Sequence, residues 1–88
     1  MVLLIAYELF DKARDQSKIE GTIKSAGTWW HHLGNAWLIE TNESPKDWFN
    51  KLAEYIYKED HILITRIYRN YYGCLPKNAW DWLFNRTY

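Results

Sequence analysis

The chain has 88 residues, enough for one domain, residues 1–88, with a modest core. Eleven basic and eleven acidic residues give a formal net charge of zero, which argues against binding of duplex nucleic acid through a broad basic surface. Aromatic residues make up 18% of the chain, and rings beyond what the core can hold favour an interface or a stacking pocket. A single cysteine, Cys74, excludes an intrachain disulfide and a cysteine-based zinc site.

The first six residues are apolar, but no basic residue precedes them and charge begins at Glu8. This run is too short for an export signal or a membrane span. A lone cysteine also suits a reducing compartment. We therefore expect a cytoplasmic protein with no membrane association.

The first half of the chain predicts a strand, a helix and a hairpin. Residues 2–9 form a strand-length apolar run with two alternating faces, Leu3, Ile5, Tyr7 and Leu9 on one and Leu4, Ala6 and Glu8 on the other. Ser17 followed by Glu20 matches a capping box, and Gly27 ends the helix that this box begins. Gly34 and Asn35 then separate the apolar runs 29–33 and 36–41, which is typical of a hairpin.

The second half predicts a helix, a strand and a short aromatic helix. Ser44 and Pro45 mark a helix start, and the apolar stripe that follows contains Trp48, Phe49, Leu52, Tyr55 and Ile56. Residues 61–68 alternate as a strand, residues 69–75 are irregular, and Pro76 can open a last helix. Trp80 and Trp82 cannot share a face of that helix, so we expect one of them to be exposed or at an interface.

These elements predict an α+β, ferredoxin-like βαββαβ sandwich with an aromatic C-terminal tail or short helix. The second strand comes either from residues 29–33 or from residues 71–75, and the hairpin favours 29–33. Two helices would cover one face of the sheet. Because we expect so short a chain to have nothing left for the other face, we predict a homodimer through that face.

Several segments carry a resemblance to a known family: Tyr7-Glu8-Leu9, residues 29–33, Gly73-Cys74-Leu75-Pro76 and residues 79–83. With these motifs the chain is similar to the SinR-like small proteins, which are related to the CRISPR-adaptation ferredoxin-like nuclease and to the virulence-associated protein D family. The resemblance implies a ferredoxin-like homodimer. In the nuclease relatives, an acidic residue at the end of the first strand of each subunit faces a divalent metal, Mg²⁺ or Mn²⁺. The matching residue here is Glu8, where the family usually has aspartate, and Asp11 is a second candidate ligand.

From the residues alone, Glu8 has a second interpretation as a strand-end carboxylate paired with Arg66 or Arg14, because an unpaired charge beside a core is costly. His31 and His32 are neighbours on a strand and point to opposite faces, so they do not share a metal. Either histidine could contact a phosphate, or it could simply pack beside tryptophan. Trp29 and Trp30 could stack a base or belong to the core.

The segment RIYRNYYG interleaves basic and aromatic side chains, namely Arg66, Tyr68, Arg69, Tyr71 and Tyr72. Such a mixture suits phosphate contact combined with base stacking, and it suits a dimer contact equally well.

The sequence therefore favours a non-enzymatic homodimeric binding module for a nucleic acid or a nucleotide-type, phosphate-bearing ligand, without a cofactor. The resemblance places such a module in phage–host conflict or mobile-element biology. One alternative is a divalent-metal-dependent nuclease that uses Glu8 from each subunit, and another is a protein-binding adaptor or inhibitor dimer.

Overall fold

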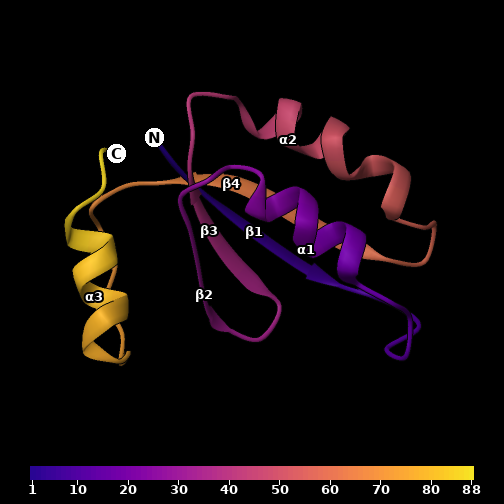
Figure 1. The fold of residues 1–88 in the computed structure, drawn as a ribbon, viewed down its shortest axis with the longest axis horizontal. Coiled ribbons are helices and arrows are strands. Elements are labelled where there is room, and N and C mark those ends of the chain that lie inside the picture. The colour runs from indigo at the N-terminus through magenta and orange to yellow at the C-terminus, as the bar shows by residue number, and fades with distance from the viewer.

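A computed structural model describes all residues from 1 to 88 as a small α+β fold, with a four-stranded antiparallel sheet and three α-helices (Figure 1). In chain order the elements are β1 (Val2–Glu8), α1 (Ser17–Lys24), β2 (Trp29–Leu33), β3 (Ala36–Glu40), α2 (Pro45–Leu52), a 3-10 turn (Ala53–Tyr55), β4 (His61–Ile67) and α3 (Lys77–Phe84). This arrangement is compatible with a ferredoxin-like fold. None of the helices combines the length and the apolar character that crossing a membrane requires.

The sheet has the strand order β2-β3-β1-β4, so β1 is an inner strand and β4 an edge. In the register, Leu4 of β1 lies opposite Leu38 of β3 and Thr65 of β4. The second strand is Trp29–Leu33, as the hairpin signal favoured, and it pairs with β3. Its pairing is irregular between Trp30 and Leu33, so the free edge of the hairpin is not a flat strand.

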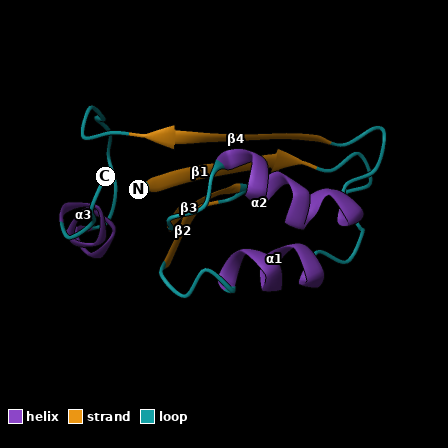
Figure 2. Cartoon of the chain, turned by 90° about the horizontal axis from the view of Figure 1, so that it is seen from above, coloured by secondary structure: helices purple, strands orange, loops and turns teal.

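Helices α1 and α2 lie side by side over one face of the sheet, which we call the helix-covered face (Figure 2). The largest apolar cluster fills the space between them and the strands: Leu3, Ile5, Tyr7, Leu9, Ile19, Ile23, Trp37, Ile39, Trp48 and Leu52. The alternation expected for residues 3, 5, 7 and 9 is confirmed. Burial raises the pKa of the Tyr7 hydroxyl, which donates a hydrogen bond to Gln16 Oε1 at 3.1 Å.

The second face of the sheet is partly covered, contrary to expectation. Helix α3 stands apart from α1 and α2 in Figure 1 and packs on this face, where a second cluster joins Val2, Trp30, Leu38, Ala79 and Leu83. The prediction that nothing in the chain remains for this face was wrong, because the short aromatic helix returns to the sheet. The cover reaches only one end of the face.

The chain beyond α3 is fastened back to the sheet by polar contacts. Glu40, the last residue of β3, forms an ion pair with Arg86 at 3.4 Å and accepts the Thr87 N–H at 2.7 Å. Arg66 of β4 donates from Nη2 to the carbonyl oxygen of Tyr88 at 2.5 Å. The two chain ends consequently lie near one another, as Figures 1 and 2 both show.

The two predicted helix starts have different outcomes. Ser44 caps α2 through the Asp47 N–H at 3.1 Å, Asp47 returns a bond to the Ser44 N–H, and Pro45 occupies the first turn. The capping box predicted at Ser17 was wrong. Ser17 is already helical, and its own N–H donates to Asp15 Oδ1 at 2.9 Å. This bond lowers the pKa of the Asp15 carboxyl, since it favours the charged form.

The ends of the first two helices follow from local geometry. Helix α1 stops at Lys24, and Gly27 after it has a φ of 85°, a conformation that glycine adopts at little cost. Helix α2 stops at Leu52, earlier than its apolar stripe suggested. Tyr55 falls in the 3-10 turn and Ile56 follows it in extended conformation.

Candidate functional site

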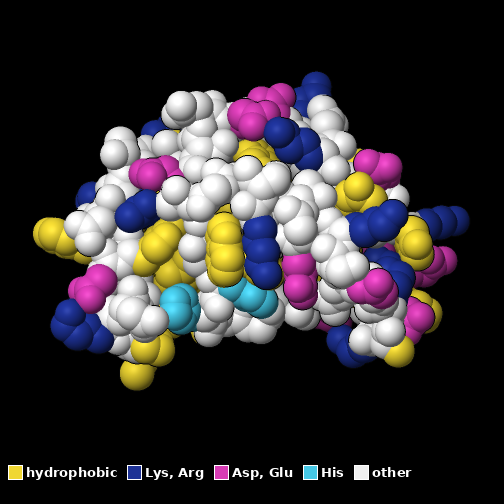
Figure 3. All heavy atoms as spheres, viewed as in Figure 1, with side chains coloured by type: hydrophobic (Ala, Val, Ile, Leu, Met, Phe, Trp, Pro, Cys, Tyr) yellow, Lys and Arg dark blue, Asp and Glu magenta, His cyan; other side chains and the backbone are white.

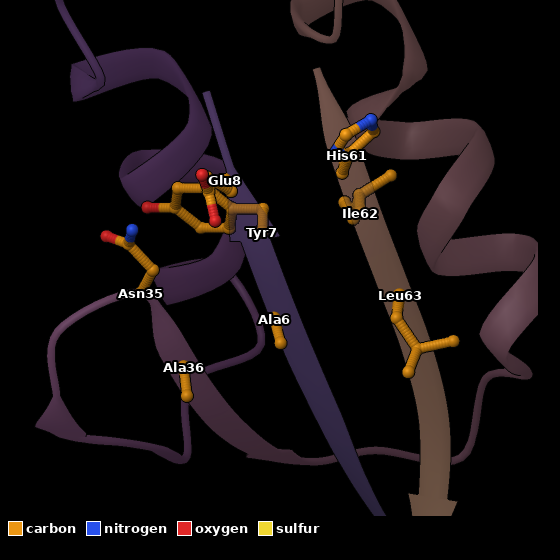
Figure 4. A pocket seen from close by; sticks show the side chains of 8 residues that line it. All are labelled: Ala6, Tyr7, Glu8, Asn35, Ala36, His61, Ile62 and Leu63. Atoms are coloured by element: carbon orange, nitrogen blue, oxygen red, sulfur yellow. The ribbon is translucent and has the colours of Figure 1, made fainter. Parts of the chain in front are cut away.

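The uncovered end of the second face forms an open depression of about 470 Å³ (Figure 4). We call it the open sheet face and define it by Ala6 and Glu8 of β1, Ala36 of β3, and His61 and Leu63 of β4. Leu63 is 62% exposed although it lies directly opposite Ala6 in the register. An apolar strand centre open to water fits a contact with another macromolecule.

Glu8 stands at the end of β1, opposite His61 of β4, and it lines this depression. Its side chain is 69% exposed, and its Oε1 lies 3.6 Å from Nζ of Lys12, four residues later in the chain. Pairing with Arg14 or Arg66 was therefore the wrong alternative, since both arginines have other partners. An exposed pair of this kind contributes little to stability and leaves the carboxylate accessible.

Asp11 lies in the loop after β1, where its Oδ1 accepts the Ala13 N–H at 3.0 Å and so closes a tight turn. No group of three or more His, Cys, Asp or Glu side chains is close enough to hold a metal ion. Glu8 and Asp11 thus do not belong to a preformed ligand set within a single chain.

A buried ion pair that sequence reasoning missed lies at the same end of the molecule. Asp60 is almost fully buried, and its carboxylate accepts from Arg14 at 2.6 Å, from the Tyr57 N–H at 2.7 Å and from the Phe10 N–H at 2.9 Å. The Arg14 guanidinium, with these backbone donors, lowers the pKa of Asp60 to about 2. The pair ties the loop after β1 to the turn before β4. Both carboxylate oxygens of Asp60 already accept hydrogen bonds from the protein, which indicates a structural role for the pair.

The second candidate region is the arginine–tyrosine surface, formed by Arg66, Tyr68, Arg69, Tyr71 and Tyr72 at the end of β4 and beyond it. The Arg66 guanidinium carbon lies 4.7 Å from the centre of the Tyr68 ring. Arg69 lies 4.6 Å from the Tyr88 ring and donates from Nη2 to the Arg86 carbonyl oxygen at 2.7 Å. Both arginines are exposed, so each keeps donors for a ligand while also holding the C-terminal segment.

The tyrosines of this surface differ in their contacts. Tyr71 stacks on Trp80, with ring centres 6.2 Å apart, and its hydroxyl oxygen lies 3.4 Å from that of Tyr88. Burial, with this neighbouring hydroxyl, raises the pKa of Tyr88. Tyr72 is fully exposed, and Tyr68 is exposed beneath the Arg66 guanidinium. Rings open to water beside guanidinium groups are able to stack an incoming base.

The hairpin histidines point to opposite faces, as predicted. His31 stacks on Trp37 at 3.7 Å between ring centres, and its Nε2 lies 2.6 Å from the Gly34 carbonyl oxygen. His32 instead contacts Trp30, with ring centres 4.9 Å apart. Both histidines therefore pack beside tryptophan.

Of the two hairpin tryptophans that could stack a base, Trp29 and Trp30, only Trp29 is accessible at the surface. Trp30 is only 4% exposed and belongs to the cluster beneath α3. Trp29 is partly exposed, and the Lys24 ammonium lies 5.1 Å from its ring. Neither Trp80 nor Trp82 is exposed, and the alternative, that one of them lies at an interface, stays a prediction. Both are half-buried, because α3 lies on the sheet and Arg86 covers the Trp82 ring at 4.7 Å.

The charges of the molecule are dispersed. On the side shown in Figure 3, acidic and basic side chains are interspersed, and histidines lie among apolar side chains where Figure 1 places the β2–β3 hairpin. No continuous basic surface suited to duplex phosphates appears on this side. The arginine–tyrosine surface is thus a local basic feature of a neutral protein.

Comparison of the chain with protein-family models, with curated proteins and with solved structures gave no match.

Proposed function

We propose that this chain is a homodimeric, non-enzymatic binding module of ferredoxin-like βαββαβ type, whose ligand is a nucleotide or a short single-stranded nucleic acid. The observation that carries the proposal is the arginine–tyrosine surface, where the exposed Tyr68 ring lies beside the Arg66 guanidinium and Arg69 and the fully exposed Tyr72 follow within a few residues. The free, exposed Cys74 fits a cytoplasmic location within this proposal.

The chemistry of this surface fits a base with its phosphate. A base stacked on a tyrosine ring contributes about 1–3 kcal/mol in single-strand recognition. A guanidinium adds charge-assisted hydrogen bonds to phosphate oxygens. Because the net charge is zero, long-range attraction is weak, so a small ligand with few phosphates fits better than a long duplex.

The dimer in this proposal uses the open sheet face. Leu63 is exposed there on the edge strand, and the small residues Ala6 and Ala36 follow it across β1 and β3, which leaves room for a partner's side chains. A twofold contact across this face brings two copies of Glu8 toward one another. The exposed Glu8 carboxylate lines this same face, and that observation favours the alternative, a nuclease with one Glu8 from each subunit around a divalent metal.

The test of the ligand proposal is fluorescence anisotropy with labelled ten-nucleotide single strands of RNA and DNA, competed with mononucleotides. Tyr72→Ala removes an exposed ring that supports no core contact, and we expect it to weaken binding about 5- to 150-fold, the equivalent of 1–3 kcal/mol. Phe49→Ala, an exposed ring on α2, is the matched control and leaves binding unchanged. Equal affinities for wild type, Tyr72→Ala and Tyr68→Ala would exclude this surface as the ligand site.

The same strands, incubated with Mg²⁺, Mn²⁺ or EDTA, separate the module from the nuclease. Intact strands are the expected result. Cleavage that requires the metal and disappears in Glu8→Ala would replace the binding module with the nuclease. Analytical ultracentrifugation of wild type and Leu63→Arg tests the dimer, and a monomeric wild type would remove that part of the proposal.

A further inference from the structure

The segment that follows α3 lies on the arginine–tyrosine surface and places one of its own rings there. The guanidinium carbon of Arg69 lies 4.6 Å from the centre of the Tyr88 ring. The Tyr71 ring contacts the same ring, with ring centres 6.0 Å apart and the two planes tilted by 40°. A guanidinium and a second aromatic ring are neighbours that favour a stacked base. The Tyr88 ring therefore has the surroundings of a bound base.

The backbone of the same segment takes up donors of both arginines. Nη2 of Arg66 donates to the carbonyl oxygen of Tyr88 at 2.5 Å. Nη2 of Arg69 donates to the carbonyl oxygen of Arg86 at 2.7 Å. A phosphate pairs with a guanidinium through charged oxygens and often through two parallel bonds, whereas each of these carbonyl groups supplies one neutral oxygen. A phosphate would thus be a stronger partner for either guanidinium than the segment is.

The attachment of this segment allows it to leave without unfolding the rest of the chain. From residue 86 onward its one backbone–backbone hydrogen bond runs from the Arg86 N–H to the Leu83 carbonyl oxygen, at 3.4 Å. On the side of the sheet, the Glu40 carboxylate contacts Arg86 and accepts the Thr87 N–H. Displacement of residues 86–88 therefore breaks no pairing between strands, and α3 ends before the displaced residues.

We propose that residues 86–88 occupy the ligand site of the arginine–tyrosine surface in the free protein, and that the bound nucleotide replaces them. The base takes the place of the Tyr88 ring beside Arg69, and a phosphate takes the place of the Tyr88 carbonyl oxygen on Arg66. Because ring and carbonyl belong to one residue, a single nucleotide is long enough to reach both places. This inference rests on the ligand proposed above and adds where its two parts bind.

The test applies the anisotropy assay with labelled ten-nucleotide strands to Tyr88→Ala and Glu40→Ala. The first variant removes the competing ring, and the second releases the segment with the ring intact. Each should bind the strands about 3- to 30-fold tighter than the wild type, because a site that must first be vacated binds in proportion to its vacant fraction. Glu43→Ala is the matched control for Glu40→Ala: it removes the same charge from an exposed residue and leaves the affinity unchanged.

A second readout follows the segment itself in ¹⁵N spectra. The amide signal of Thr87 reports on its bond to Glu40, so saturation of the wild type with the unlabelled strand should move this signal toward its position in Glu40→Ala. The amide signal of Thr22, on α1, should stay in place. The spectra also show which variants remain folded. This matters for Tyr88→Ala, which removes a hydroxyl that donates to the Leu83 carbonyl oxygen at 2.7 Å.

The outcomes separate this inference from the proposed function. Tighter binding by a folded variant, together with the shift of the Thr87 signal, would support the inference. If the wild type binds and Tyr72→Ala weakens binding, but neither Tyr88→Ala nor Glu40→Ala tightens it, the proposed function stands and the inference is overturned. A Thr87 signal that stays in place at saturation would also overturn it. Strands that bind neither the wild type nor the two variants would overturn both proposals.

Discussion

The docking of α3 on the second face leads to a sharp prediction for Leu83→Ala. Leu83 is 4% exposed and belongs to the cluster with Val2, Trp30, Leu38 and Ala79. The substitution removes three carbon atoms from this cluster, which costs about 2.4 kcal/mol at roughly 0.8 kcal/mol for each buried methylene. Leu83 also lines an apolar pocket of about 270 Å³, and its truncation enlarges this empty space, which adds a cavity term to that loss. We expect a total loss of about 3 kcal/mol.

Such a loss is large for a domain of this size, because an 88-residue chain at about 0.05–0.15 kcal/mol per residue has a total stability of roughly 4–13 kcal/mol. Urea unfolding, followed by tryptophan fluorescence and by far-UV circular dichroism, measures it. Phe84→Ala is the matched control. It changes the next residue, which is 74% exposed, and should shift stability by less than about 0.5 kcal/mol. If both variants behave alike, α3 does not dock through Leu83 and the argument for the second cluster fails.

Two further predictions concern the buried ion pair and the helix starts. The folded pKa of Asp60, about 2, lies below its ordinary value of 3.8, so the stability it contributes is complete above about pH 4 and disappears as the pH falls toward 2. Asp60→Asn should therefore be less stable at neutral pH and should flatten this acid dependence in urea titrations at several pH values, whereas Glu59→Gln, an exposed neighbour, should retain it. Ser44→Ala removes a capping hydrogen bond and should cost about 1 kcal/mol, while Ser17→Ala, which has no capping bond to lose, should be nearly neutral in the same assay. Equal losses for the two serine variants would contradict the assignment of the caps.

Local patterns in the sequence predicted most of the elements because their causes are local. The Gly34-Asn35 turn determined the hairpin, and the alternation from Leu3 to Leu9 determined which side chains face α1 and α2. Ser44 and Pro45 determined where α2 begins. Each of these signals depends on a few neighbouring residues, and each holds in the structure.

The features that sequence reasoning missed depend on residues far apart in the chain. The contact of Asp60 with Arg14 spans two loops, and neither loop has a spacing that indicates the other. Helix α3 packs on Val2 and Leu38, and Glu40 accepts the Thr87 N–H beyond it, and no periodicity predicts either contact. Within the candidate site, the sequence grouped Arg66 and Tyr68 in one basic-aromatic cluster, but it indicated neither their direct contact nor the role of Arg66 in holding Tyr88.

The position of β1 between two apolar clusters has a consequence for how the sequence can vary. Leu3 and Ile5 contribute to the cluster beneath α1 and α2, while Val2 belongs to the cluster beneath α3 and Leu4 packs against it. Successive residues in the first half of this strand thus pack against different clusters, so substitution is restricted on both faces of residues 2–5. Leu63 on β4 is exposed, so packing within its own chain does not restrict which side chain stands there. Among descendants of this sequence, residues 2–5 should change slowly, and change at position 63 should follow whatever binds there.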